Sequence, residues 1–308
     1  MHSKCVVRGL LFMKLAILSD IHGNRPALEA VAADIDAWRP DRVLVNGDVV
    51  NDGPNSVACW RYVARRRHDD GWQVLRGNHE EYVTEWRDPS TPRQGPAYEL
   101  IRLSQWTYEQ FGGDVAELAE LPDRWEWAAP DGTALIAMHG TLPGNRVGIY
   151  PFTPDETIRQ RIPAVAAVFV TAHTHIAHIR HLDSTLVVNI GSVGIPGDGD
   201  GRAAYGRFTW EQGCGWQAEI RRVDYDRSAA ERDYFTSGFM TGVGPEAELS
   251  LVQFRMARDV RTRWSANYRE RILNGELSVM ESVDQWLRRD EFRGYRLADA
   301  PAPRPAVC

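Results

Sequence analysis

Short apolar runs alternate with segments of helical periodicity over the first eighty residues. Residues 14–18 form an apolar run that stops at a Ser-Asp pair, and residues 26–38 then repeat apolar side chains at the three-to-four-residue spacing of a helix. The apolar runs recur at residues 42–45 and 73–75, with a second helical segment between them. This alternation predicts βα units and a sheet buried on both faces, with ligand sites at the carboxyl ends of its strands.

Later apolar runs predict the remaining strands. They cover residues 134–138, 168–170, 186–188, 205–210 and 216–223, the last two as an antiparallel pair. Three Ser/Thr-x-x-Glu pairs predict helix starts by the capping-box pattern, at Thr153/Glu156, Ser228/Glu231 and Ser278/Glu281.

The character of the sequence changes along the chain and predicts its division. We expect one α/β domain over residues 14–227, in which residues 80–113 form a helical insertion that could lie over a site. Residues 228–300 are helical in pattern and rich in arginine, which predicts a helical extension. The proline-rich residues 301–308 predict a disordered tail.

Composition indicates an ordinary globular protein. Hydrophobic residues make up 43% and charged residues 25% of the 308, and the net charge of -6 makes a polyanion such as DNA no default partner. Four widely separated cysteines without a C-x-x-C pair predict free thiols. No apolar run approaches the roughly 20 residues of a membrane span. The segment before Met13 lacks the length and cleavage site of a secretory signal, so we expect a cytoplasmic protein.

Five of the predicted strands end in side chains that can bind a metal. These side chains are Asp20, His22, Asp48, Asn78, His79, His139, His173 and His175. Histidine is scarce in the chain, at nine in 308 residues, and polar groups at neighbouring strand ends converge on one crevice. Oxygen and imidazole ligands without sulfur favour Mn²⁺, Fe, Zn²⁺, Co²⁺ or Ni²⁺. So many ligands suit two ions, which together would leave the site positive for a phosphate.

At these residues the chain resembles the calcineurin-like metallophosphoesterase superfamily. Its five motifs occur in order as Asp20-Ile21-His22, Gly47-Asp48, Gly77-Asn78-His79-Glu80, His139-Gly140 and Ala172-His173-Thr174-His175. The resemblance covers about residues 14–223 and implies an α/β fold, a four-layer αββα sandwich. The remaining parts would be the helical insertion and the C-terminal helical extension.

The resemblance also implies a role for each residue. Asp20, His22 and His175 would hold one divalent ion, Asn78, His139 and His173 the other, and Asp48 would bridge the two. His79 would not bind metal but would protonate the leaving group, so that His79, Asn78 and Asp48 are the expected catalytic residues. The implied activity is hydrolysis of phosphomono- or phosphodiesters by in-line attack of a metal-bridging hydroxide, with Mn²⁺ the preferred ion in vitro.

The match to particular branches is mixed. The motifs are similar to those of small bacterial and archaeal phosphodiesterases, and in part to those of protein phosphatases and diadenosine tetraphosphatases. The last two groups have a phosphate-binding arginine where this chain has Asp52, which argues against protein phosphatase activity. Asn51 stands where protein phosphatases carry an aspartate that orients the acid histidine, a role that Asp52 could take over. Ala172 replaces a usual glycine and requires a negative φ at that position.

Two alternatives stay open beside a small-molecule phosphoesterase. The same fold also serves as an inactive protein-interaction scaffold, although such scaffolds have lost metal ligands. Six arginines between residues 255 and 271 permit a phosphodiesterase that processes nucleic acid or nucleotides, with a solvated helix face as the simpler interpretation. We expect a phosphate-ester small molecule or a nucleotide as substrate, with Asn24 and Arg25 as weak candidates for contacting it.

Overall fold

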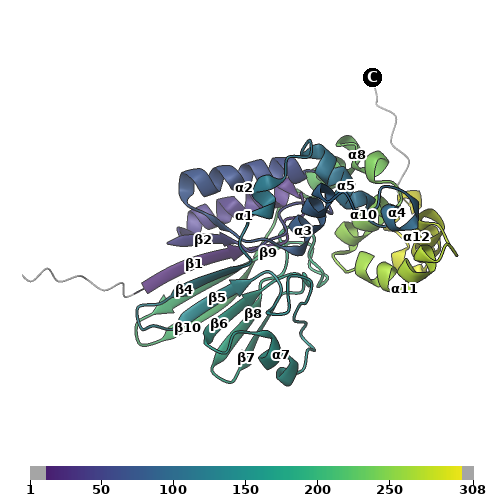
Figure 1. The fold of residues 1–308 in the computed structure, drawn as a ribbon. Helices are drawn as coiled ribbons and strands as arrows, with labels where there is room; N and C mark the ends of the chain where they lie inside the picture. The colour runs from purple at the N-terminus through teal and green to yellow at the C-terminus, as the bar shows by residue number, and fades with distance from the viewer. Residues whose placement is uncertain (1–11, 300–308) are drawn as a thin grey trace, which may run out of the picture.

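Two five-stranded sheets pack face to face, with helices on their outer faces (Figure 1). The computed structural model describes residues 12–299. The predicted tail at 301–308 and the thiols Cys5 and Cys308 lie outside the described residues, whereas Cys59 and Cys214 are free thiols as predicted.

The first sheet has the strand order β10-β9-β1-β2-β3. Its strands are β1 (Phe12–Leu18), β2 (Arg42–Val45), β3 (Gln73–Val74), β9 (Ala203–Glu211) and β10 (Gly215–Val223). β1, β2 and β3 are parallel, and β9 pairs antiparallel with both β1 and β10. The helices α1 (Arg25–Trp38) and α2 (Ser56–Asp70) follow the first two strands and cover the outer face.

The second sheet has the order β4-β5-β6-β8-β7. Its strands are β4 (Arg124–Ala128), β5 (Ala134–Met138), β6 (Ala166–Thr171), β7 (His178–Leu182) and β8 (Thr185–Asn189). The helix α7 (Asp155–Arg161) packs on its outer face through Ile158, beside Phe169 of β6. The helix layer, two sheets and second helix layer confirm the predicted four-layer sandwich.

Strand β1 explains why the predicted strands are continuously apolar. Successive side chains of a strand point to opposite faces. Leu15 and Ile17 therefore pack between the sheets, whereas Ala16 and Leu18 pack under α1 and α2. All four are at most 1% exposed, so neither face of the strand can accept a polar residue.

Helices gather at one end of the sandwich (Figure 1). Those between β3 and β4 are α3 (Asn78–Thr84), η1 (Glu85–Arg87), α4 (Gly95–Glu99), α5 (Arg102–Gln110) and α6 (Ala116–Ala119). Those after β10 are α8 (Arg227–Thr236), α9 (Phe239–Val243), α10 (Glu246–Met256), α11 (Arg261–Leu273), α12 (Val279–Leu287), η2 (Asp290–Phe292) and η3 (Leu297–Asp299). The two groups share a core in which Trp106 of α5 packs edge-on against Phe239 of α9. None of the helices within residues 12–299 is long and apolar enough for a membrane crossing.

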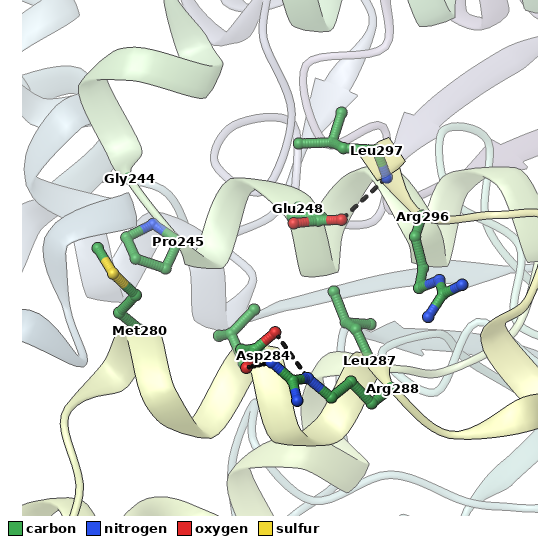
Figure 2. A pocket seen from close by; sticks show the side chains of 10 residues that line it. Gly244, Pro245, Glu248, Met280, Asp284, Leu287, Arg288, Arg296 and Leu297 are labelled. Atoms are coloured by element: carbon green, nitrogen blue, oxygen red, sulfur yellow. Dashed lines mark hydrogen bonds and ion pairs between the residues drawn. The ribbon is translucent and has the colours of Figure 1, made fainter. Parts of the chain in front are cut away.

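A pocket of about 700 Å³ opens among the C-terminal helices, between the start of α10 and α12 (Figure 2). Its charged lining residues are already engaged, since Arg288 pairs with Asp284 at 2.7 Å and Glu248 accepts the backbone N–H of Leu297 at 2.9 Å. None of the predicted metal ligands lines this pocket.

Two strands and two helix caps differ from the sequence analysis. β4 and β7 are half-exposed edge strands, so a search for continuous apolar runs overlooks them. The cap predictions at Thr153 and Ser228 are wrong. Thr153 Oγ1 accepts the N–H of Tyr150 and α7 starts after Pro154, whereas α8 is capped by Asp226, which accepts the N–H of Ala229. The capping box at Ser278 and Glu281 is confirmed.

Candidate metal centre

The loops that follow β1, β2, β3, β5 and β6 bring the predicted ligands to one edge of the sandwich. The first two loops pair with each other, because the N–H groups of Ile21 and His22 both donate to the carbonyl of Asp48, at 2.8 and 3.0 Å. Five residues of the predicted ligand set have φ in the left-handed region: Asp20 (54°), His22 (47°), Asp48 (54°), His173 (65°) and His175 (59°). Such backbone conformations are unfavourable for residues with a Cβ and gather at functional sites.

A buried carboxylate holds these loops in place. Glu80 accepts the N–H of Asp48 and of Gly77, each at 2.8 Å, and also the N–H groups of Val49 and Val50, at 2.8 and 3.2 Å. Burial and the nearby Asp48 carboxylate raise the pKa of Glu80, while the backbone donors act in the opposite direction. Glu80 belongs to the third predicted motif, but the motif assigns it no role. The sequence signal is the position of this glutamate, three residues after Gly77 at the start of a helix. That is the capping-box spacing, which indicates that the carboxylate accepts backbone N–H groups.

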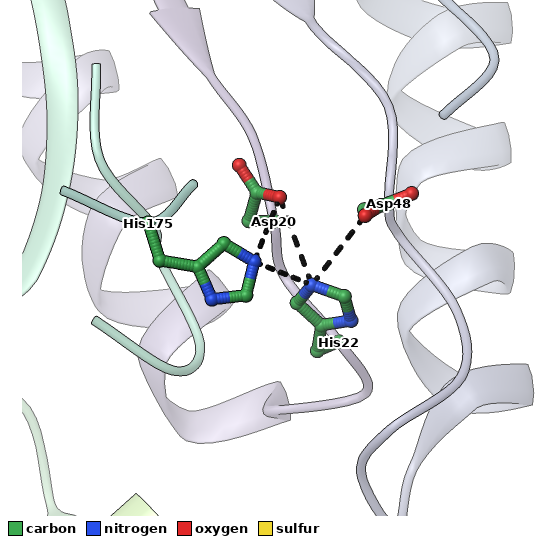
Figure 3. A group of neighbouring side chains, drawn as sticks. All are labelled: Asp20, His22, Asp48 and His175. Carbon is green, nitrogen blue, oxygen red and sulfur yellow. Dashed lines mark hydrogen bonds and ion pairs between the residues drawn. The ribbon is translucent and has the colours of Figure 1, made fainter. Parts of the chain in front are cut away.

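Asp20, His22, Asp48 and His175 form the first group of ligand atoms (Figure 3). The two Nε2 atoms of His22 and His175 lie 3.2 Å apart, and His175 Nε2 lies 3.1 Å from Asp20 Oδ1. Each imidazole has a backbone carbonyl at Nδ1, that of Asn51 at 3.3 Å for His22 and that of Ile195 at 2.9 Å for His175. The hydrogen of each ring therefore belongs on Nδ1, and both Nε2 lone pairs point inward.

A second group of ligand atoms shares Asp48 with the first. His139 Nε2 lies 3.2 Å from Asp48 Oδ2 and 3.0 Å from Asn78 Oδ1, and His173 Nδ1 lies 2.8 Å from the same Asn78 oxygen. The Nδ1 atom of His139 has the carbonyl of Asn46 at 2.9 Å, so its Nε2 also turns a lone pair inward. Asp48 Oδ2 lies 3.6 Å from His22 Nε2 and thus stands between the two groups.

These atoms fit a bound cation. Asp20 Oδ1 and Asp48 Oδ2 are buried and have no hydrogen-bond partner within residues 12–299. Facing them are imidazole nitrogens that carry lone pairs, so only a positive charge satisfies the cluster. Without a metal, burial lowers the pKa of His139, but the Asp48 carboxylate raises it more strongly, to about 10. A proton is then held at the place where a cation fits.

His79 lies beside the first group without joining it. Its ring centroid is 4.6 Å from that of His22, and its Nδ1 is 3.0 Å from Asn51 Nδ2. Thr107 of α5 donates to Asn51 Oδ1 at 3.0 Å, which turns the amide nitrogen toward His79 and leaves the imidazole hydrogen on Nε2. Burial lowers the pKa of His79 to about 3, with Asp48 acting in the opposite direction, so the imidazole of the free protein is neutral at pH 7.

The other residues singled out from the sequence have local partners. Asn24 caps α1 by accepting the N–H of Ala27 at 3.2 Å and donates to the carbonyl of Gly194 at 2.8 Å. Arg25 pairs with Glu29 at 2.8 Å on the surface. A substrate contact by Asn24 or Arg25 therefore stays a prediction.

Asp52 pairs with Arg261 rather than with His79, a contact between residues 209 apart that no motif indicates. Ala172 is absent from the positive-φ residues, as its Cβ requires.

Comparison with known proteins places the chain. The sequence model of the calcineurin-like phosphoesterase superfamily domain matches residues 13–213. A metallophosphoesterase from Sphaerobacter thermophilus is 23% identical with a TM-score of 0.60, over 80% of this chain and 99% of that chain. The hypothetical protein PH1004 from Pyrococcus horikoshii OT3 is 18% identical with a TM-score of 0.60, over 76% of this chain and 95% of that chain. At these identities the two structures show a shared fold. No curated protein sequence is significantly similar.

The matched region spans both sheets, from β1 through β9, and includes every residue of the two ligand groups. The chain belongs to the calcineurin-like phosphoesterase superfamily.

Proposed function

We propose that this protein is a dinuclear-metal-dependent phosphoesterase that hydrolyses phosphomono- or phosphodiesters. The observation that carries the proposal is the place of Asp48. Its Oδ2, which accepts no hydrogen bond within residues 12–299, lies 3.6 Å from His22 Nε2 in one ligand group and 3.2 Å from His139 Nε2 in the other. One carboxylate oxygen that faces two sets of lone pairs suits a pair of ions rather than one.

In this proposal Asp20, His22 and His175 hold one ion and Asn78, His139 and His173 the other, with Asp48 shared. Ligands of this kind suit Mn²⁺, Fe, Zn²⁺, Co²⁺ or Ni²⁺, and Mn²⁺ is the ion for a first test. When bound, two such ions lower the pKa of a water molecule and neutralise the charge of a phosphate.

The protein's own groups supply the remaining requirements. Asn78 presents its amide oxygen between His139 and His173, and the backbone N–H of His79 donates to Asp48 Oδ1 at 2.8 Å, which fixes the shared carboxylate. His79 keeps a hydrogen on Nε2 and is the candidate donor to the leaving oxygen. A neutral imidazole can stabilise the leaving oxyanion through this hydrogen bond, whereas transfer of a proton to it requires the imidazolium form of His79.

A small phosphate ester or a nucleotide is the proposed substrate. For nucleic acid the arginines between residues 255 and 271 would have to be free to contact phosphates. Four of the six pair with carboxylates instead: Arg255 with Glu231, Arg261 with Asp52 and Glu246, Arg263 with Glu291, and Arg271 with Glu276. A metal-free interaction scaffold is disfavoured because both ligand groups are complete.

The test combines metal analysis with turnover. The purified protein, stripped with a chelator and then dialysed against Mn²⁺, is expected to bind two equivalents by elemental analysis. It should then release p-nitrophenol from p-nitrophenyl phosphate or from bis(p-nitrophenyl) phosphate, whereas the stripped protein should not. A protein that binds no metal and hydrolyses neither ester is an interaction scaffold, and the proposal is then wrong. One equivalent with full turnover would reject only the dinuclear part.

A further inference from the structure

We propose that Arg261, carried by the C-terminal helices, contacts the phosphate group of the substrate and makes the site prefer phosphomonoesters over phosphodiesters. This inference rests on the proposed phosphoesterase function and deepens it. Arg261 is the first residue of α11, yet its side chain reaches Asp52 in the loop that follows β2. The chain segment that supplies it lies outside the region matched to the family, which ends at residue 213.

Arg261 is close to the residues expected to do chemistry. It pairs directly with Asp52, and the side-chain ligand atoms of Asp52, His22 and His79 all lie within 4.8 Å of one another. The guanidinium is thus near His79, the candidate donor to the leaving oxygen.

Two carboxylates hold the guanidinium in one orientation. Nη1 pairs with Asp52 Oδ1, and Nη2 pairs with Glu246 Oε2 of α10 at 2.9 Å. Ser250 donates to the same Asp52 oxygen at 3.1 Å, which fixes the first of these carboxylates. A planar guanidinium held at two corners is already oriented for a tetrahedral anion, and little rotational entropy is lost when it binds one.

The guanidinium retains donors for such an anion. It has five N–H groups, of which the two contacts use one on each Nη atom. Nε is buried and has no partner within the described part of the chain, so both contacts with the carboxylates are made by the Nη atoms. The side chain is 21% exposed, whereas Asp52 is 6% and Glu246 2% exposed. Of this cluster, the arginine is therefore the member that solvent or a ligand can reach.

The pairing also removes an obstacle that the sequence suggested. A free aspartate at position 52 would repel a phosphate from a site that contains His22 and His79. Because Arg261 pairs with Asp52, it offsets the charge of the carboxylate that an incoming anion would otherwise meet.

The number of phosphate oxygens connects this arginine to substrate choice. A phosphomonoester has three non-bridging oxygens and a phosphodiester two. Two of these oxygens are enough to contact the two proposed ions, one at each ligand group. Only a monoester therefore has a third non-bridging oxygen that Arg261 can contact. Loss of the guanidinium should therefore weaken monoester binding selectively, which a merely structural ion pair would not do.

The experiment compares Arg261→Ala with Arg263→Ala, a control on the same helix whose arginine pairs with Glu291 at 3.2 Å on the surface. In the Mn²⁺-loaded proteins, Arg261→Ala should raise KM for p-nitrophenyl phosphate about tenfold and KM for bis(p-nitrophenyl) phosphate by less than about threefold. Calorimetric titration with inorganic phosphate should show about a tenfold weaker Kd, with bound Mn²⁺ unchanged. Arg261→Lys should recover part of the loss, because it keeps the charge but not the fork of donors.

Arg261→Ala could fold poorly because it leaves the buried Asp52 carboxylate without its cation. In that case the double variant Asp52→Asn/Arg261→Gln removes both charges of the pair and allows the same comparison. An unchanged phosphate Kd, or an equal loss on both esters, would overturn the role of Arg261. Absence of turnover in the wild-type protein would instead reject the phosphoesterase proposal. The phosphate titration would still report on Arg261 in that case.

Discussion

Asn51 joins the helical insertion to His79. Its amide accepts a hydrogen bond from Thr107 of α5 on one side and donates to His79 Nδ1 on the other, with both distances at 3.0 Å. An isolated imidazole could carry its hydrogen on either nitrogen. Here the chain of two hydrogen bonds places it on Nε2, so a residue of the insertion determines what His79 can donate.

Thr107→Val tests this relay. Valine has nearly the shape of threonine but cannot donate, so the amide of Asn51 becomes free to rotate and His79 loses its defined tautomer. We expect kcat to fall about tenfold with KM and bound Mn²⁺ nearly unchanged. Thr236→Val is the matched control, since Thr236 Oγ1 donates to the carbonyl of Arg232 within α8. A normal kcat in Thr107→Val would show that the relay does not position His79.

His79→Ala tests the donor itself. The variant should keep its metals, because His79 is absent from both ligand groups, and should slow by roughly 10²-fold to 10³-fold on esters with poor leaving groups. Esters with good leaving groups need less protonation and should slow much less. A series of substituted phenyl phosphates gives the dependence of kcat on leaving-group pKa, which should steepen in the variant. An equal loss along the whole series would contradict the donor role.

Asp48→Asn tests the shared carboxylate. The amide removes a negative charge that faces both ligand groups and puts an N–H where a lone pair is needed. We expect bound metal to fall below one equivalent and activity to drop at least roughly 10³-fold. Asp183→Asn, which removes a surface carboxylate paired with Arg159, serves as the control. Full metal content in Asp48→Asn would exclude a bridging role.

Glu246 makes stability depend on pH. Burial raises the pKa of Glu246 to about 7 from the usual 4.5, Arg261 opposes this, and the charges of Asp52 and Glu99 add to it. Because the folded-state pKa is the higher one, this contribution to stability is complete below pH 4.5 and is lost as the pH rises through about 7. Glu246→Gln cannot ionise and should escape the loss, which is of order 2 kcal/mol.

Urea unfolding at pH 5 and pH 8 measures this difference. The wild-type protein should lose stability relative to Glu246→Gln between the two values. Glu270→Gln, at an exposed position on α11, should follow the wild type. Parallel curves for the wild type and Glu246→Gln would show that Glu246 is already ionised at pH 5.

The sequence predicts the interior of the sandwich better than its periphery. A strand such as β1 is recognisable because both of its faces are buried, and the ligands are recognisable because they follow such strands. β4 and β7 each lie at a sheet edge and lack this pattern. Thr107 and Arg261 contact Asn51 and Asp52 from segments far along the chain, and no spacing in the sequence connects these residues before the chain is folded. Glu80 is recognisable in the sequence as part of a motif, but the four backbone N–H groups that it accepts can be identified only from the folded structure.

The left-handed backbone at Asp20, His22, Asp48, His173 and His175 has an energetic consequence. Each such residue holds the chain above its conformational minimum by roughly 1–3 kcal/mol, and the packed sheets beneath must tolerate the sum. Cations that bind as proposed would find the ligand geometry already formed, and the loops would not have to reorganise. Glycine at these five positions would relieve the backbone strain but would remove the metal ligands. The free energy of unfolding and metal binding therefore favour different residues at the same five positions.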